Sequence, residues 1–535
     1  MKNKLYLIVL LSAFVLSACG EDFLNTKSTS QVDQGQIFET TETAQMAVEG
    51  LHRAMYYRGS SAPQMGYGVF IMWNEMLGED LVHTKQNAQW STQAKWSLHR
   101  NTTSSHLRYL YKFFYSLIAN ANMVIESIDS AEGPDNQKDN LKGQALAYRA
   151  FAHYCLVQLW AKRYDWAGNN TQDGVILRLT NSTDPAPRAT VEEVYAAINE
   201  DLDESIRLLA GCGIARSNKS QIDANVVRGI KARVLLTTGR FADAAAMAEQ
   251  VISQSGAALS TTIYEKKQGR MCDASNSEWI WGKVDEPTLY YHYYYEFFSY
   301  ISNTNVSYNK NTPRAIYNLL YARIPETDIR KTLWLENAPG MDKKEIVYPP
   351  AGNIYKWMSQ KYIVDYPDNT SSNYNGSKFT ADIPYMRIAE MYLIAAEAYA
   401  RTNNESKAKD LLTKLVVTRD PAYTGSSNSG EALIEEILFQ RRIELWGEGF
   451  RFCDLKRLHM ALDRGPKPRE GYNQGGWKSN AVQTNLDPLA SNYNMYDAQE
   501  TGEENRYRDA DSIEWQFVIP QLEIDYNPLC KQNPI

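Results

Sequence analysis

Apolar residues recur at helical spacing along much of this chain, and this periodicity limits the fold more than any other feature. They fall three or four positions apart, which places them on one face of a helix. The segments that show it are Thr41 to about Tyr57, Leu107 to Ile128, Leu141 to Trp160, and Thr190 to about Leu209. Thr190 and Glu193 form a capping box at the start of the last segment. The pattern predicts a predominantly α-helical protein.

Two later segments, Ala224–Ser253 and Met386–Thr418, repeat one another. Their matching positions are Ala232, Gly239, Ala244 and Ala248 in the first copy, and Ala396, Asn403, Ala408 and Leu412 in the second. The spacing resembles a tetratricopeptide hairpin, in which small residues let two helices pack closely. An ordinary helical hairpin with small contact residues fits these positions equally well.

A loop-rich insertion, about 255–383, separates the two copies. It is rich in Asn, Tyr, Pro and Gly, and its strand-like runs, such as Glu278–Lys283, are short. A second irregular stretch covers about 464–508. Because long loops on a rigid frame usually carry binding, we expect recognition to reside in these two regions.

The first residues have the order of an export signal. Lys2 and Lys4 precede an apolar run, Leu5–Leu16, that is too short to span a bilayer. Leu16-Ser17-Ala18-Cys19 is similar to the cleavage box of bacterial lipoproteins, in which the cysteine becomes the lipidated first residue. We therefore expect residues 1–18 to be a signal peptide and 19–535 to form a single domain anchored by lipid on Cys19.

The acidic residues directly after that cysteine indicate the membrane face to which the protein is sent. Glu21 and Asp22 resemble the signal that sends some lipoproteins to the outer face of the outer membrane. The alternative is an ordinary acidic tether.

Charge and cysteine content exclude several classes of protein. The 56 Lys and Arg against 63 Asp and Glu give a net charge of −7, and no long basic run appears, which argues against nucleic acid as a partner. The five cysteines after Cys19 are scattered without CxxC spacing, so neither a disulfide framework nor a zinc site is indicated. The 35 tyrosines and 12 tryptophans predict many surface rings, which can stack on apolar faces of ligands.

Four stretches, in order along the chain, resemble the SusD/RagB family of outer-membrane nutrient-binding lipoproteins. The first is the box ending in Cys19, with Phe23-Leu24 and the helix from Thr41. The second is Ala147-Tyr148-Arg149-Ala150 with Thr190-x-x-Glu193-Val194-Tyr195 and Asp201-Leu202. The third is Asp382-Ile383-Pro384-Tyr385-Met386-Arg387 with Ala395-Ala396-Glu397-Ala398. The fourth is Arg441-Arg442-x-Glu444-Leu445-x-x-Glu448-Gly449-x-Arg451-x-x-Asp454-Leu455-Lys456-Arg457, with Ile519-Pro520 and Gln532-Asn533-Pro534. Gln440 departs from the Glu that the family often has there, which puts a local ion pair in doubt.

The resemblance implies a SusD-like fold of tetratricopeptide-like hairpins, with a loop-rich insertion carrying short strands. It also implies a non-catalytic lipoprotein on the cell surface, which binds a nutrient oligosaccharide and delivers it to a TonB-dependent, SusC-like transporter. Part of the family captures peptides, so a peptide receptor is the alternative. A scaffold that recruits proteins and a glycan-degrading enzyme rank below both.

The charged residues of the fourth stretch could be mistaken for catalytic acids. Glu444, Glu448 and Asp454 stand three or four positions from arginines, which favours ion pairs between successive helical turns and a structural role. The sequence contains no HExxH pair, GxSxG elbow or GxxxxGK loop. We therefore assign no catalytic residue, cofactor or metal ligand, and leave open a structural Ca²⁺ on loop oxygens.

An aromatic tract, Leu289–Tyr300, is the first candidate ligand site. Tyr291, Tyr293 and Tyr295 would share one face of a strand, opposite His292 and Tyr294. Sugar rings stack on such tyrosines, while polar neighbours bind the hydroxyls. The alternative is a strand with one face in the core.

The second candidate lies between Gly78 and Arg100. Members of the family usually hold their ligand with loops in these two regions, but no motif marks individual residues. On chemical grounds we choose Asp80, Trp90, Trp96 and Arg100. Each tryptophan could instead belong to the core.

Overall fold

A computed structural model describes residues 37–57, 59, 64–83, 90–264, 271–284, 297–301, 314–334, 359, 361–362, 382–464 and 507–535. Helices dominate this part of the chain, as the periodicity predicts. The long ones are α3 (Thr41–Ala54), α4 (Gly68–Leu77), α6 (Ser105–Ser127), α7 (Asp135–Trp160), α8 (Val191–Gly211), α9 (Ala224–Thr237), α10 (Phe241–Gln254), α14 (Ile388–Arg401), α15 (Glu405–Val416) and α16 (Gly430–Glu444). Shorter helices are α5 (Ser91–Ala94), α11 (Phe298–Ile301), α13 (Asn318–Ala322), α17 (Arg451–Arg457) and α18 (Gln521–Tyr526), with 3₁₀ turns η2 (Leu98–Arg100), η3 (Ile128–Ser130), η4 (Ile329–Leu333) and η5 (Ile513–Trp515).

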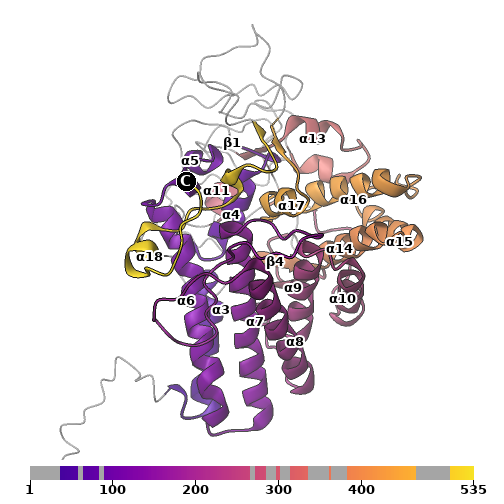
Figure 1. The fold of residues 1–535 in the computed structure, drawn as a ribbon. Helices are drawn as coiled ribbons and strands as arrows, with labels where there is room; N and C mark the ends of the chain where they lie inside the picture. Colours follow the sequence, from indigo (N-terminus) through magenta and orange to yellow (C-terminus); the bar gives the residue numbers. More distant parts are fainter. Residues whose placement is uncertain are drawn as a thin grey trace, which may run out of the picture.

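From α6 onward, the long helices form an array in which each packs against the next along the chain. α6 contacts α7, α7 contacts α8, α8 contacts α9, and α9 contacts α10 (Figure 1). Across the insertion, α10 packs on α14 and α14 on α15 and α16, while α3 lies against α6 and α7. Each apolar stripe is therefore covered by its neighbour, which is how helical repeats build a continuous core.

The two repeated segments are helical hairpins, as predicted, and they stack directly on each other. Gly239 and Asn403 turn the chain in the left-handed region, at φ of 73° and 59°. The matching residues on the helices are 0 to 1% exposed: Ala232, Ala244, Ala248, Ala396, Ala408 and Leu412. Small side chains thus sit where the helices approach most closely.

The predicted capping box at the start of α8 is confirmed. Thr190 and Glu193 each accept from the other's backbone N–H. Further along α8, Asp201 receives two hydrogen bonds from Arg149 of α7, Nε to Oδ2 at 2.8 Å and Nη2 to Oδ1 at 2.6 Å. This buried bidentate pair joins two helices whose sequences carry the second family-like stretch.

Three two-stranded antiparallel sheets occur in the described residues. They are β1 (Leu81–His83) with β3 (Arg314–Ile316), β2 (Trp279–Lys283) with β4 (Ile383–Arg387), and β5 (Leu462–Asp463) with β6 (Tyr507–Arg508). β2 confirms the strand predicted at Glu278–Lys283. Its pairing with β4, in register Trp279↔Arg387, joins a strand early in the insertion to the strand that leads into α14.

The C-terminal segment closes the array against the end of α7. Phe517 N–H donates to the Leu159 carbonyl at 3.0 Å, and Val518 N–H to that of His99 at 3.0 Å. Asn533 Nδ2 donates to the carbonyls of Trp160 at 2.6 Å and Phe517 at 2.8 Å. Among the described residues, no helix has the length and apolarity needed to span a bilayer.

Gly449, in the turn between α16 and α17, packs against the backbone of α4. Its φ is +86°, and a Cβ there would lie 2.8 Å from the Cα of Ile71. Left-handed backbone costs a residue with a side chain roughly 1–2 kcal/mol. The contact adds to that cost because the neighbouring atom is backbone and has little freedom to move.

Gly449→Ala is therefore expected to lower the free energy of unfolding by about 2 kcal/mol or more. Gly211→Ala is the control, because its Cβ would meet nothing within 4 Å. At the end of α8 this change should be neutral or stabilising by up to about 1 kcal/mol. Chemical denaturation followed by circular dichroism measures both, and equal midpoints would contradict the close packing at Gly449.

Candidate functional site

A balanced set of buried charges lies where α14, α15 and α16 meet the insertion. We call it the central ion cluster; its cations are Arg330, Lys361, Arg387 and Arg419, and its carboxylates are Glu278, Asp328, Glu444 and Glu448. Glu444 is the hub: Oε1 accepts from Arg419 Nη2 at 2.9 Å and Arg387 Nη1 at 3.1 Å, and Oε2 accepts from Arg330 Nη1 at 3.2 Å. Glu278 bridges Arg387 and Arg419 at 2.7 Å each.

The cluster keeps its carboxylates ionised despite their burial. Burial alone would raise the pKa of Glu444, but Arg419, Arg387 and Arg330 hold that pKa well below its usual value. Burial would likewise raise the pKa of Glu448, but Arg387 and Lys361 lower it below its usual value. Four cations face four carboxylates, so no net charge is left for a ligand to neutralise. The cluster is structural, as predicted.

The partners differ from the prediction, because most of the pairs join distant segments. Arg451 Nε donates to Glu79 Oε1 at 2.9 Å, and Arg457 Nη1 donates to Glu397 Oε1 at 2.7 Å. Only Arg457 with Asp454, at 2.7 Å, is a pair between successive turns of α17. Gln440, the departure from the family pattern, still accepts from Arg330 Nη2 at 2.5 Å. An amide oxygen thus serves there in place of a carboxylate.

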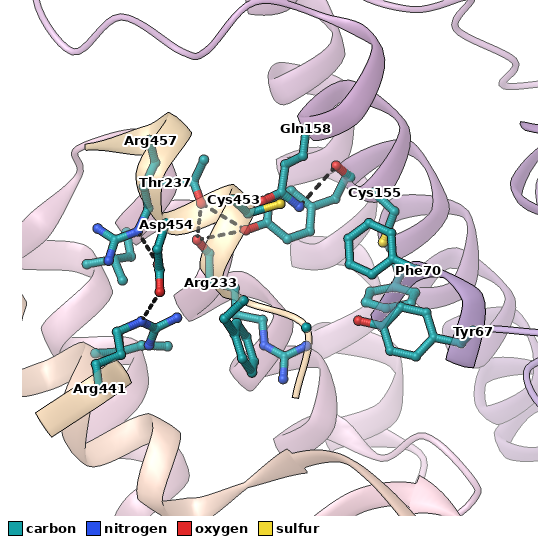
Figure 2. A pocket seen from close by; sticks show the side chains of 16 residues that line it. Tyr67, Phe70, Cys155, Gln158, Arg233, Thr237, Arg441, Cys453, Asp454 and Arg457 are labelled. Atoms are coloured by element: carbon teal, nitrogen blue, oxygen red, sulfur yellow. Dashed lines mark hydrogen bonds and ion pairs between the residues drawn. The ribbon is translucent and has the colours of Figure 1, made fainter. Parts of the chain in front are cut away.

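An internal cavity of about 40 Å³ lies between α4, α7, α9 and the α16–α17 turn. Figure 2 shows Tyr67 and Phe70 on one side and the ion-paired Arg441, Asp454 and Arg457 on the other. Such a volume holds a few water molecules at most. The cavity is therefore too small for a sugar ring.

The structure gives Asp80 and Arg100, two of the predicted site residues, internal partners. Both Asp80 oxygens accept from Arg442 Nε, at 3.1 and 3.0 Å, and Asp80 is 2% exposed. Arg100 Nη1 donates to the Gln516 carbonyl at 2.5 Å, and Nη2 donates to that of Pro534. Asp80 thus holds α16 to the end of α4, and Arg100 fastens the C-terminal segment.

The two predicted tryptophans flank α5 and are buried. Trp96 is 1% exposed, donates from Nε1 to the Leu77 carbonyl at 2.9 Å, and meets Trp515 edge to face with ring centroids 4.8 Å apart. Trp90 is 2% exposed and meets Tyr300 edge to face at 5.6 Å. Both rings therefore lie where the alternative, that each tryptophan belongs to the core, would place them. Tyr291, Tyr293 and Tyr295, together with Cys19, lie outside the described residues.

A cleft near the C-terminal segment is lined by charged residues, most of which have internal partners. It encloses about 330 Å³ between the end of α7 and residues 510–516. Arg163 pairs with Asp165 at 3.4 Å, and His459 Nε2 lies 2.7 Å from Asp511. Lys456 Nζ donates hydrogen bonds to three backbone carbonyls, those of Gln158, Ala161 and Trp515. Of the charged residues that line this cleft, only the exposed Lys162 has no ion pair or hydrogen bond among the described residues.

An open groove between α3 and α6 is different, because none of its three cations pairs with a carboxylate among the described residues. We call it the α3–α6 groove; it encloses about 620 Å³, and its described lining is Gly50, Arg53, Ala54, Tyr57, Gln64, Ser105, Arg108, Tyr109, Lys112, Phe113 and Ser116. The two helices lie side by side at one edge of the array (Figure 1). Pockets that hold small ligands commonly enclose 300–1,000 Å³, so an oligosaccharide segment fits.

Aromatic rings form part of the groove's surface. Tyr57, beyond the end of α3, is 60% exposed. On α6, the rings of Tyr109 and Phe113 are close to parallel, at an angle of 16° with centroids 6.4 Å apart. The Tyr109 hydroxyl accepts from Gly66 N–H at 3.2 Å, which fixes the ring. Phe113 is 9% exposed and belongs to the core, so the exposed Tyr57 and the half-buried Tyr109 are the rings that a ligand with apolar faces can reach.

Sequence reasoning missed the α3–α6 groove. Arg108 with Lys112, and Tyr109 with Phe113, stand four positions apart on a predicted helix, which is a readable signal for one flank. The other flank, with Arg53 and Tyr57, comes from a helix 50 residues away in the chain. Nothing local indicates that α3 would lie beside α6.

The described residues contain no cluster of side chains suited to bind a metal ion. Across the described ranges, no group of three or more His, Cys, Asp or Glu side chains is placed to hold a metal ion. No disulfide joins the five cysteines in these ranges, which are Cys155, Cys212, Cys272, Cys453 and Cys530.

Comparison with protein families identifies the family of the chain. Residues 22–228 match a family described as starch-binding and associating with the outer membrane, and residues 341–535 match the SusD family. The chain belongs to the SusD family. This membership agrees with the four family-like stretches of the sequence, which are distributed over both matched regions.

Relatives of this SusD-family protein match it over most of their length. A SusD-like protein, P38, of Formosa agariphila is 24% identical over 502 residues, which is 85% of this chain and 91% of the relative. A solved SusD-like carbohydrate binding protein of Bacteroides vulgatus superposes with a TM-score of 0.73 at 23% identity, covering 92% of this chain and 97% of the other. A SusD superfamily protein of Bacteroides thetaiotaomicron gives 0.69 at 21% identity, covering 93% and 100%. At these identities the solved structures establish the SusD-like fold.

Glu444→Gln tests the central ion cluster. The change removes the carboxylate that three buried arginines share and leaves part of their charge uncompensated. The free energy of unfolding at pH 7 should therefore fall by about 3–5 kcal/mol. The folded pKa of Glu444 lies below its unfolded value, so its contribution is present above about pH 4.5 and is lost as the pH falls through the folded pKa. The variant should therefore lose less stability than the parent between pH 7 and pH 4.

The exposed Glu435→Gln, on the same helix, is the matched control and should shift unfolding by less than about 0.5 kcal/mol. Urea titrations at pH 7 and pH 4 compare the three proteins. If both variants unfold at the parent's midpoint, Glu444 is not the hub that its contacts indicate.

Proposed function

We propose that this SusD-family protein binds a nutrient oligosaccharide at the outer membrane and delivers it to a TonB-dependent, SusC-like transporter. The observation that carries the proposal is the match of residues 22–228 to a family described as starch-binding and associating with the outer membrane. The solved relative of Bacteroides vulgatus, named a carbohydrate binding protein, supports the same ligand class.

The chemistry of the surface supports a glycan. The α3–α6 groove offers an exposed tyrosine, the half-buried ring of Tyr109 and the hydroxyls of Ser105 and Ser116. Rings stack on the apolar faces of sugars, while hydroxyl and amide groups bind their polar edges. The aromatic tract with Tyr291, Tyr293 and Tyr295 is a second proposed contact region, and it lies outside the described residues.

The proposed function includes a lipid anchor on Cys19. The charged start, the short apolar run and the small residues before Cys19 support it. Several acyl chains on one residue would hold the protein stably at the membrane, next to the transporter.

The proposed role is binding without catalysis. Burial raises the pKa of Glu75 to about 7, a value suited to a general acid. Glu75 is nevertheless 1% exposed and accepts from Gly449 N–H at 2.8 Å, so it faces the turn after α16 and no open groove. A peptide receptor, the alternative raised by the sequence, has no observation that favours it over a glycan receptor.

Isothermal titration of residues 20–535 against a panel of neutral and charged oligosaccharides, with peptides alongside, tests the proposal. We expect saturable binding to one glycan class, because rings and free polar groups are displayed for it. Tyr293→Ala should weaken that binding by roughly tenfold, the loss expected from one stacked ring.

Tyr294→Ala is the matched control, because a strand places neighbouring residues on opposite faces and only one of the two should contact the ligand. Binding to peptides with no heat from any glycan would overturn the proposal. Equal loss in both variants, with the melting temperature lowered, would assign the tract to the core.

Cys19→Ser tests the anchor in cells that process lipoproteins. Without a thiol to acylate, the variant should lose incorporation of labelled palmitate and leave the membrane fraction. The control is Cys272→Ser, which changes a half-buried thiol, keeps Cys19 and should stay with the membrane. Palmitate labelling and fractionation that match the parent would contradict lipidation at Cys19.

A further inference from the structure

The α3–α6 groove concentrates positive charge without compensation. Arg53, Arg108 and Lys112 line it, and its described lining contains no Asp or Glu. None of the three cations has an ion pair or side-chain hydrogen bond within the described part of the chain, and all three are exposed. The chain as a whole carries a net charge of −7. The groove is therefore locally positive on a protein whose net charge is negative.

The charges and the rings occupy one continuous surface. Arg108 and Lys112 lie four residues apart on α6, about 6 Å along the helix axis, so they project on the same side. Tyr109 and Phe113 repeat that spacing one position further on and form the near-parallel pair. Arg53 and Tyr57 present the same combination, four positions apart, from the α3 side of the groove. Each wall thus pairs a cation with a ring.

We propose that the α3–α6 groove binds a negatively charged oligosaccharide through its carboxylate or sulfate groups, an inference that rests on the proposed glycan-binding function. Guanidinium and ammonium groups bind such anions with charge-assisted hydrogen bonds. The neighbouring rings accept the apolar faces of the same sugar units. Ser105, Ser116 and Gln64 supply partners for its hydroxyls.

An anionic sugar fits the groove better than the other acidic ligands of similar size. A neutral glycan would use the rings and leave three cations without partners. An acidic peptide would use the cations, but its backbone needs an exposed strand edge or a row of amide partners, and the described groove lining contains no strand and lies mostly on α3 and α6. Charged sugar units use both halves of the surface.

Arg108→Gln/Lys112→Gln tests the proposal by removing two charges while keeping the length and polarity of the side chains. Titration calorimetry of residues 20–535 uses a hexagalacturonate and its methyl ester, and a sulfated oligosaccharide with its desulfated form. We expect a charged sugar to bind at least tenfold more tightly than its neutralised form in 50 mM salt. The double variant should abolish that preference, and 500 mM salt should weaken the parent's binding by a similar factor.

Lys407→Gln/Lys414→Gln on α15 is the matched control, because it removes the same charge from two exposed side chains outside the groove. It should leave the preference unchanged. Tyr57→Ala should weaken charged and neutralised sugars alike, since a ring stacks on both.

The outcomes separate this inference from the proposed function. Binding of neutral and charged glycans with equal affinity, unchanged in the double variant, would overturn the inference and leave the glycan receptor standing. Binding of a poly-glutamate peptide that requires Arg108 and Lys112, with no glycan bound, would overturn both. A concentration-dependent dimer that the double variant abolishes would assign the groove to a second copy of the chain instead.

Discussion

The contact of Glu444 with three buried arginines is the interaction on which the rest of the structure depends. Around it, the central ion cluster joins the start of β2, the end of β4, the turn after α15 and the end of α16. Replacing a complete buried ion set with apolar residues is often harmless, whereas removing one member leaves an uncompensated charge. The cluster therefore fixes which segments meet rather than adding much net stability. By holding both β2 and β4 to the helical array, it gives the loops of the insertion a rigid base.

Arginine and aromatic side chains serve opposite purposes inside the protein and on its surface. Arg100 and Trp96 bond to backbone carbonyls and pack against the C-terminal segment. Arg108 and Tyr57 have the same chemistry but remain exposed at the α3–α6 groove. What separates the two sets is whether the fold supplies a partner. A cation or ring whose partners are internal stabilises the frame, and one without an internal partner is available to a ligand. Residue type alone does not make that distinction, so the sequence does not show that Trp96 and Arg100 have internal partners.

Local patterns in the sequence predicted the helices, the capping box at Thr190 and the hairpin turns at Gly239 and Asn403, because each depends on residues a few positions apart. The same reasoning predicted a structural role for Glu444 and Asp454 but paired them with arginines on successive turns. The actual partners of Glu444 are Arg330, Arg387 and Arg419, which come from three other segments. Spacing shows which residues share a helix face, while the element that packs against that face is chosen by the fold.

The sequence by itself determined the helical class, the repeated hairpins and the resemblance to the SusD family, since these are written in periodicity and in motifs of fixed order. The tertiary structure alone decided which charges are buried as pairs, which tryptophans enter the core, and that α3 lies beside α6 to form an open groove with free cations. The physical reason is that burial and the pairing of charges depend on contacts between segments tens to hundreds of residues apart. Those contacts exist only once the apolar faces of the whole array have been covered.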